Sequence, residues 1–163
     1  MNTAGRLLGL SGALLVIGAA LAGCDAGGGM YKSSPPKSLY ERLGGEPAIK
    51  AVCEDFLQRA LANPKLNLTR KGTAHEWDPS PRNVERLNKL VVQFVCMATG
   101  GPQKYEGRDM KTAHHGMRIT EAEFGMAAED LIASLNKFNV PKSLQDELIA
   151  LVATTKKDIV EMK

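Results

Sequence analysis

The sequence predicts one all-α domain that follows an N-terminal targeting segment. Of its 163 residues, 44% are hydrophobic and 24% are charged, a balance typical of a globular domain and not of a disordered or fibrous chain. From residue 38 onward, apolar side chains recur at steps of three and four residues, and no alternating strand pattern is visible. Glycine pairs and prolines divide this pattern into segments of helical length.

The first expected elements are a short helix over residues 38–43 and a longer helix over residues 47–62. The Gly-Gly pair after residue 43 ends the short helix, because glycine readily adopts the positive backbone angles found there. Pro47 suits the first turn of the longer helix. The buried stripe of this helix has helical spacing and consists of Ile49, Val52, Phe56 and Ala60.

The third helix is expected over residues 81–98. Ser80 is its expected N-cap, and Pro81 occupies the first helical position, where a missing N–H is tolerated. One face of this helix is apolar and carries Leu87, Leu90, Val91, Phe94, Val95 and Ala98. The sequence Gly-Gly-Pro then ends the helix.

Two more helices are expected over residues 120–137 and 141–161. Thr120 and Glu123 fit a capping box at the start of the first, and a proline opens the second. Residues 101–119 are too polar and too rich in glycine for a long helix. The four long helices are therefore expected to form two antiparallel pairs in chain order.

Residues 1–23 have the features of a signal peptide, with Arg6 as the only charge before a long apolar stretch. The stretch ends in Leu-Ala-Gly-Cys at Cys24, which resembles the bacterial lipobox, in which the cysteine thiol receives a diacylglyceryl group. We therefore expect lipidated Cys24 as the first mature residue and residues 24–37 as a flexible tether. This implies a membrane-anchored lipoprotein that faces the periplasm or the cell exterior, and Asp25 favours the inner membrane.

Charge and histidine spacing exclude several classes of function. The net charge is +3, and no basic block is present that could follow a phosphate backbone, so nucleic acid is not an expected partner. The three histidines, His75, His114 and His115, do not recur with other metal-ligating residues at a zinc-finger spacing. No Gly-x-Ser-x-Gly sequence supports a serine nucleophile.

Ordered motifs between residues 98 and 120 carry the most specific signal. They are Ala-Thr-Gly-Gly-Pro at 98–102, Tyr-x-Gly at 105–107 and Met-Lys-x-x-His-x-Gly-x-x-Ile-Thr at 110–120. They resemble group I truncated haemoglobins, in which the glycine pair follows the helix over the distal face of the haem and the last motif supplies the axial histidine. Ser-Leu-Tyr-x-x-Leu-Gly-Gly at 38–45 resembles the opening segment of the same family.

This resemblance implies a truncated globin-like two-over-two helical sandwich over residues 38–163, a b-type haem and His114 as the iron ligand. An iron-bound imidazole usually donates its other ring N–H to a fixed acceptor, here the carbonyl of Met110 or Lys111. His115 would point about 100° away on a helix and is expected to face solvent. The resemblance places Tyr105 and Lys111 near the haem propionates, although a packing tyrosine and a solvated lysine fit these positions equally well.

The expected haem pocket is apolar. Its candidate walls are Phe56, Leu57, Leu87, Leu90, Val91, Phe94, Met117, Ile119 and Phe124. Two positions depart from the family pattern, since Leu57 stands where group I proteins usually have a tyrosine, and Val91 where many have a glutamine. Both of those polar residues bind oxygen in the family, so this pocket is expected to lack their hydrogen-bond donors.

A third departure lies after the second helix, where an aromatic pair often covers the haem edge. Thr69 and Arg70 stand there, and an insertion over residues 71–80 follows. The insertion contains His75 and Trp77, and it either folds over the haem mouth or forms a solvated loop with Trp77 packed on the core.

Cys53 and Cys96 lie on helices that are expected to cross. An extracytoplasmic compartment would permit a disulfide between them, and buried free thiols are the alternative. Sequence spacing does not decide between the two.

The function expected from these features is the binding of O2, CO or NO at a histidine-ligated haem, with an unidentified reductase as a possible partner. A haem-dependent nitric oxide dioxygenase or redox enzyme is the alternative, and the missing distal tyrosine and glutamine argue against it. A third alternative is a haem-free helical interaction protein.

The lipoprotein interpretation predicts that Cys24→Ser leaves an unlipidated precursor, because the serine hydroxyl cannot form the thioether. Membrane fractionation and incorporation of labelled lipid in a bacterial host measure this outcome. Equal membrane retention and equal labelling in the variant and the parent would refute the interpretation.

Overall fold

The structure is a computed structural model that describes residues 35–162. The expected signal peptide, Cys24 and most of the expected tether lie outside the described residues. The helices are α1 (Leu39–Arg42), α2 (Gly45–Ala62), α3 (Pro81–Ala98), α4 (Met110–His114), α5 (Glu121–Lys137), α6 (Lys142–Ala153) and α7 (Lys156–Ile159). The described part of the chain contains no β-strand beyond one isolated parallel bridge, and none of its helices is long and apolar enough to cross a membrane.

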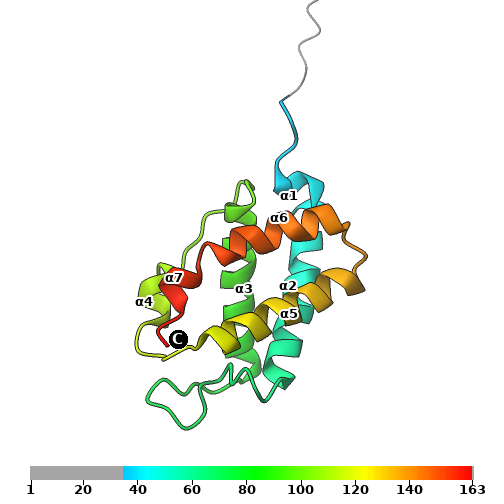
Figure 1. The fold of residues 1–163 in the computed structure, drawn as a ribbon. Coiled ribbons are helices and arrows are strands. Elements are labelled where there is room, and N and C mark those ends of the chain that lie inside the picture. Colours follow the sequence, from blue (N-terminus) through cyan, green and yellow to red (C-terminus); the bar gives the residue numbers. More distant parts are fainter. Residues whose placement is uncertain (1–34, 163) are drawn as a thin grey trace, which may run out of the picture. The chain divides into compact units, whose positions relative to one another are not determined.

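The long helices form two layers. Figure 1 shows α2 and α3 side by side in one layer, with α5 and α6 crossing in front of them. The short helix α1 contacts α2 and α6, and α4 contacts α7. The predicted all-α class and the two-over-two helical sandwich are confirmed.

Local sequence signals explain the starts of several helices. The expected capping box of α5 is present, since Thr120 N–H donates to Glu123 (2.8 Å) and Glu123 N–H donates to the Thr120 hydroxyl (3.1 Å). Ser38 and Glu41 form a second box at α1. Ser80 is the N-cap of α3 as expected, but its side chain makes no capping hydrogen bond.

The expectation of a single helix over residues 141–161 is wrong. The chain forms α6 and α7, with a break at Thr154 and Thr155. Both threonine hydroxyls donate 2.7 Å hydrogen bonds to carbonyls three residues earlier. The N–H groups of Thr154 (3.1 Å) and Thr155 (3.0 Å) donate to the same carbonyls, which tightens the last turn of α6. The apolar stripe continues across this break, so periodicity alone did not reveal it.

Within residues 101–119, the structure places the five-residue helix α4, which the sequence did not predict. The expectation of no long helix there is correct. Asp109 caps α4 by accepting a 2.9 Å hydrogen bond from Thr112 N–H, a contact that depends on local sequence.

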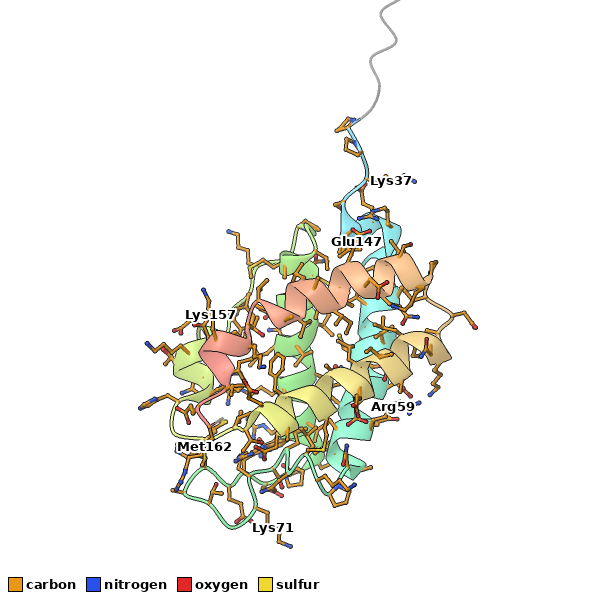
Figure 2. All side chains as sticks on the ribbon, in the orientation of Figure 1. Lys37, Arg59, Lys71, Glu147, Lys157 and Met162 are labelled. Carbon is orange, nitrogen blue, oxygen red and sulfur yellow. The ribbon has the colours of Figure 1, made fainter. Side chains whose placement is uncertain are left out.

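The core lies between the two layers, where side chains from α2, α3, α5 and α6 meet (Figure 2). Its buried cluster consists of Ile49, Val52, Cys53, Val92, Val95, Cys96, Leu131, Leu135 and Leu148. Cys53 and Cys96 are free thiols, so the structure contains no disulfide between them. Burial raises the pKa of Cys53 to about 12 and that of Cys96 to about 11, which keeps both thiols protonated at neutral pH.

One carboxylate is buried where α2 crosses α5. Asp55 is only 7% exposed and accepts hydrogen bonds from Lys137 Nζ, from Arg59 Nε (2.7 Å) and from the hydroxyl of the fully buried Ser134 (2.8 Å). Lys137 first, and then Arg59, lower the pKa of Asp55 well below that of an ordinary aspartate. The ionised carboxylate therefore ties the second half of α2 to the last turns of α5.

We predict that Asp55→Asn lowers the free energy of unfolding at pH 7 by about 1–3 kcal/mol, because its buried partners lose a charge-assisted acceptor. The pKa of Asp55 is lower in the folded state than in the unfolded state, so this stabilisation is present at neutral pH and decreases as the pH falls below about 4. Urea unfolding at pH 7 and pH 3.5 measures both effects, and the difference between parent and variant should shrink at the lower pH.

Asp146→Asn is the matched control, since Asp146 is exposed and pairs with Lys142 on the surface of α6. An exposed pair contributes little, so this variant should unfold like the parent. Equal destabilisation by the two substitutions would contradict the role assigned to Asp55.

Candidate functional site

The imidazole of His114 is oriented by its own helix. Its Nδ1 lies 2.8 Å from the carbonyl oxygen of Met110, which confirms Met110 as the acceptor among the two expected. A carbonyl can only accept, so Nδ1 donates, and Nε2 of the neutral ring carries a lone pair that is free to bind a metal. The side chain of His115 is 84% exposed, as expected for a residue that faces solvent.

The segment after α4 is braced by the C-terminal residues. The Glu161 carboxylate accepts 2.7 Å hydrogen bonds from the N–H groups of Gly116 and Arg118. The Ile119 carbonyl accepts from the N–H groups of Glu161 (2.9 Å) and Met162 (3.1 Å). The Gly116 and Arg118 N–H groups lower the pKa of Glu161, so the brace carries a charge at neutral pH.

A second brace reaches the same segment from the loop between α2 and α3. Arg70 Nη2 donates to the Met117 carbonyl (2.5 Å), and Nη1 pairs with Glu123 at the start of α5 (2.7 Å). Burial alone would raise the pKa of Glu123, but hydrogen bonds from Thr120 N–H and Arg70 outweigh it and lower this pKa. Arg70 is 8% exposed, and its Nε is buried without a hydrogen-bond partner.

Most of the predicted wall residues are less buried than the core. The half-buried ones come from α2, α3, α5 and the segment after α4, and they are Phe56, Leu87, Leu90, Val91, Phe94, Met117, Ile119 and Phe124. Leu57 is the exception, at 3% exposed. Phe56, Val91 and Phe94 pack against the buried core cluster.

Tyr105 packs against one of these residues, Phe94. Its ring meets Phe94 edge to face, with ring centres 5.6 Å apart, and its hydroxyl donates to the Arg108 carbonyl (2.9 Å). Burial raises the pKa of Tyr105, so the hydroxyl stays protonated. Lys111 is exposed on α4.

The insertion over residues 71–80 forms a loop beside the segment after α4. Trp77 is half-buried, and its indole N–H donates to the Leu68 carbonyl (2.9 Å), so Trp77 packs within the loop. His75 is exposed, and its ring lies against Gly116, where an added Cβ would come within 2.7 Å of His75 Nε2. Gly116 also has a φ of +78°, which favours glycine at this position.

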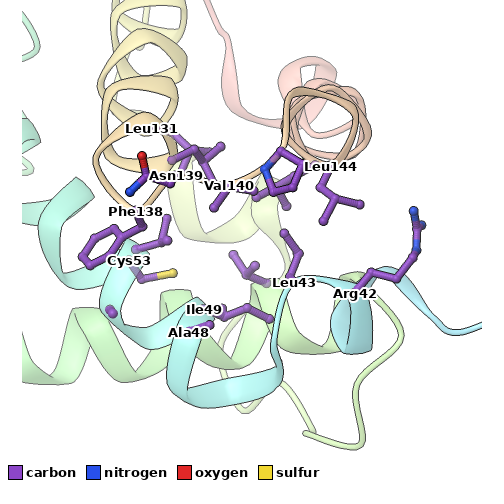
Figure 3. A pocket seen from close by; sticks show the side chains of 16 residues that line it. Arg42, Leu43, Ala48, Ile49, Cys53, Leu131, Phe138, Asn139, Val140 and Leu144 are labelled. Carbon is purple, nitrogen blue, oxygen red and sulfur yellow. The ribbon is translucent and has the colours of Figure 1, made fainter.

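An apolar pocket of about 270 Å³ lies elsewhere, between α1, α2, α5 and α6 (Figure 3). Leu43 and Ile49 project into it from one side, and Leu131, Val140 and Leu144 from the other. None of the predicted haem-wall residues lines this pocket. It is therefore separate from the site around His114.

The residues around His114 fit a haem. The group needs an imidazole whose second nitrogen donates to an acceptor, and the bond between His114 and Met110 supplies this. It also needs apolar side chains around it, and the half-buried apolar residues of α2, α3, α5 and the segment after α4 are of this type.

Comparison with known proteins decides the family. A family model described as "Bacterial-like globin" matches residues 38–161. The chain belongs to this family. The Group 1 truncated hemoglobin GlbN of Mycolicibacterium paratuberculosis is 34% identical over 123 residues, which cover 76% of this chain and 84% of that protein. The Group 1 truncated hemoglobin of Tetrahymena pyriformis is 30% identical over 125 residues, 77% of this chain and 96% of that protein.

Solved structures agree. The crystal structure of truncated hemoglobin from Tetrahymena pyriformis in the Fe(III) form has a TM-score of 0.66 at 30% identity, and covers 76% of this chain and 98% of that chain. The group II truncated hemoglobin from Bacillus anthracis has a TM-score of 0.66 at 19% identity, a likeness of fold alone. The chain is thus a group I truncated globin, with haem and its iron as the cofactor and a diatomic gas as the ligand.

Sequence reasoning missed the two braces of this globin. A signal existed for Arg70, since it departs from the aromatic pattern of the family. None existed for Glu161, because its acceptor role depends on pairing with a segment 45 residues earlier in the chain.

Proposed function

We propose that this truncated globin binds diatomic gases at a haem iron ligated by Nε2 of His114, and that lipidated Cys24 holds it at a membrane outside the cytoplasm. The hydrogen bond between His114 Nδ1 and the Met110 carbonyl carries the ligation proposal, because it fixes both the tautomer and the ring orientation. The lipobox at residues 21–24 is the support for the anchor.

The pocket walls proposed from the sequence would hold the faces of the haem, and Tyr105 and Lys111 would lie near its propionates. The exposed ammonium group of Lys111 suits a carboxylate at the pocket mouth. When bound, ferrous haem would supply the iron to which a diatomic gas binds. The chain's own task is then to keep the His114 ring in place and to exclude water from the apolar side.

Two aliphatic residues define the distal side in this proposal. Leu57 and Val91 offer no hydrogen-bond donor, so an O2 ligand, which gains negative charge on binding, lacks the stabilisation that a distal tyrosine and glutamine provide. The Trp77 N–H is already bonded to Leu68, and His75 lies against Gly116. These contacts argue against either residue as a substitute donor and also weigh against dioxygenase chemistry.

His114→Ala is expected to abolish the Soret absorption of purified protein, because the iron loses its only proposed protein ligand. His115→Ala should leave the absorption largely intact, since this side chain faces solvent. Spectra of the reduced protein with and without CO make the comparison. Loss of the Soret band in His115→Ala alone would show that the ligand assignment is wrong.

A second prediction concerns gas selectivity. The double substitution Leu57→Tyr with Val91→Gln adds distal donors, and a hydrogen bond to O2 contributes about 1.5–3 kcal/mol. At about 1.4 kcal/mol per decade, O2 dissociation should slow by roughly tenfold to a hundredfold. Stopped-flow measurements test this, with CO as the internal control because its dissociation should change much less.

In the parent, O2 release should be fast and CO should be strongly preferred. An unchanged O2 rate in the double variant would contradict the placement of Leu57 and Val91. A slow parent rate that persists in His75→Ala and Trp77→Phe would do the same.

A further inference from the structure

Arg70 occupies a position that the family pattern assigns to an aromatic cover of the haem edge. An aromatic ring there would pack on the cofactor, but it could not hydrogen-bond a backbone carbonyl. Arg70 is instead a buried cation, 8% exposed. A buried cation is unfavourable unless it is paired, so its partners indicate what it does.

The backbone at Arg70 is fixed in an unusual conformation. Its φ is +53°, in the left-handed region that residues with a Cβ adopt at a cost. The turn is held by the Arg70 N–H, which donates to the Asn67 carbonyl (2.8 Å), and by the Arg70 carbonyl, which accepts from the Thr73 hydroxyl (2.7 Å) and N–H (3.1 Å). The loop is thus locked in a conformation in which the side chain is buried.

The guanidinium joins the loop between α2 and α3 to the segment after α4 and to the start of α5, about 50 residues later in the chain. Its Nη2 donates to the carbonyl of Met117, three residues after His114, and its Nη1 pairs with Glu123 in the first turn of α5. Glu123 uses its second carboxylate oxygen to cap α5 through Thr120. Nε has no partner, so the side chain makes these two hydrogen bonds. Together they link the segment after His114 to the start of α5.

We infer that Arg70 is a positioning residue of the haem site, which fixes the segment after His114 onto α5 and thereby sets the orientation of the His114 ring and the retention of haem. This inference rests on the ligation by His114 proposed above. The planar guanidinium reaches a carbonyl and a carboxylate at once, in a fixed geometry. Lysine, a compact point charge, cannot reproduce this geometry.

The test compares haem-loaded Arg70→Met and Arg70→Lys with the parent. The iron–histidine stretching band in resonance Raman spectra of the ferrous protein reports the orientation of the ring, and haem transfer to an excess of a tight-binding acceptor reports retention. Arg70→Met should shift and broaden the band and speed haem loss by roughly tenfold to a hundredfold. Arg70→Lys should restore only part of both properties.

Arg42→Met is the matched control, because Arg42 also makes a two-bond pair with a carboxylate, Glu147, but joins α1 to α6. It should leave the band and the rate of haem loss unchanged. A double-mutant cycle with Glu123→Gln should be non-additive, since the two side chains act through one contact.

The two proposals fail in different ways. If His114→Ala keeps the iron–histidine band, the proposed ligation is wrong. If that variant loses the band while Arg70→Met retains the parent band and haem-loss rate, the inference on Arg70 is overturned. Equal shifts of the band in Arg70→Met and Arg42→Met would also overturn it, because a general loss of stability would then explain both.

Discussion

The helix that carries the proposed iron ligand is too short to be stable by itself. Forming the first turn of a helix fixes the backbone of several residues and makes only one hydrogen bond, and α4 has only five residues. Its position must therefore come from its neighbours. Asp109 caps its start. Beyond its end, the Glu161 carboxylate and the Arg70 guanidinium form hydrogen bonds with the backbone of the following segment. The geometry of His114 is thus a property of the tertiary structure, although the hydrogen bond to Met110 is local.

Helix α5 makes ionic contacts with other elements near both of its ends. At its start, Glu123 caps the helix through Thr120 and binds the buried Arg70. Near its end, Ser134 and Lys137 hold the buried carboxylate of Asp55 on α2. Ionic groups stand at both ends of α5, and the apolar cluster fills the space between the layers. The segment after α4 and helix α2 are therefore both held in position by contacts that involve α5.

Features encoded within three or four residues were predictable from sequence. The capping box of Thr120 and Glu123 was expected from its spacing, and the carbonyl of Met110 was one of the two acceptors expected for His114. The pairs of Arg70 with Glu123, and of Glu161 with Gly116, join positions far apart in the chain, and no local pattern reveals such partners. The break between α6 and α7 was missed for a different reason, because the threonine hydroxyls compete for helix carbonyls while the apolar periodicity runs on.

The distribution of polar groups bears on how this globin controls its ligand. In the proposed site the distal residues are aliphatic, so hydrogen bonding to the gas cannot adjust affinity. Ligand affinity would then depend on the proximal side, through the basicity and orientation of the His114 imidazole. These two properties depend on the acceptor at Nδ1 and on the contacts that hold α4 in place. In the proposed site the charged residues Arg70, Glu123 and Glu161 would act on that side, since their contacts hold the segment that follows His114. With aliphatic residues on the distal side, this chain would therefore adjust ligand binding from the face that holds the iron.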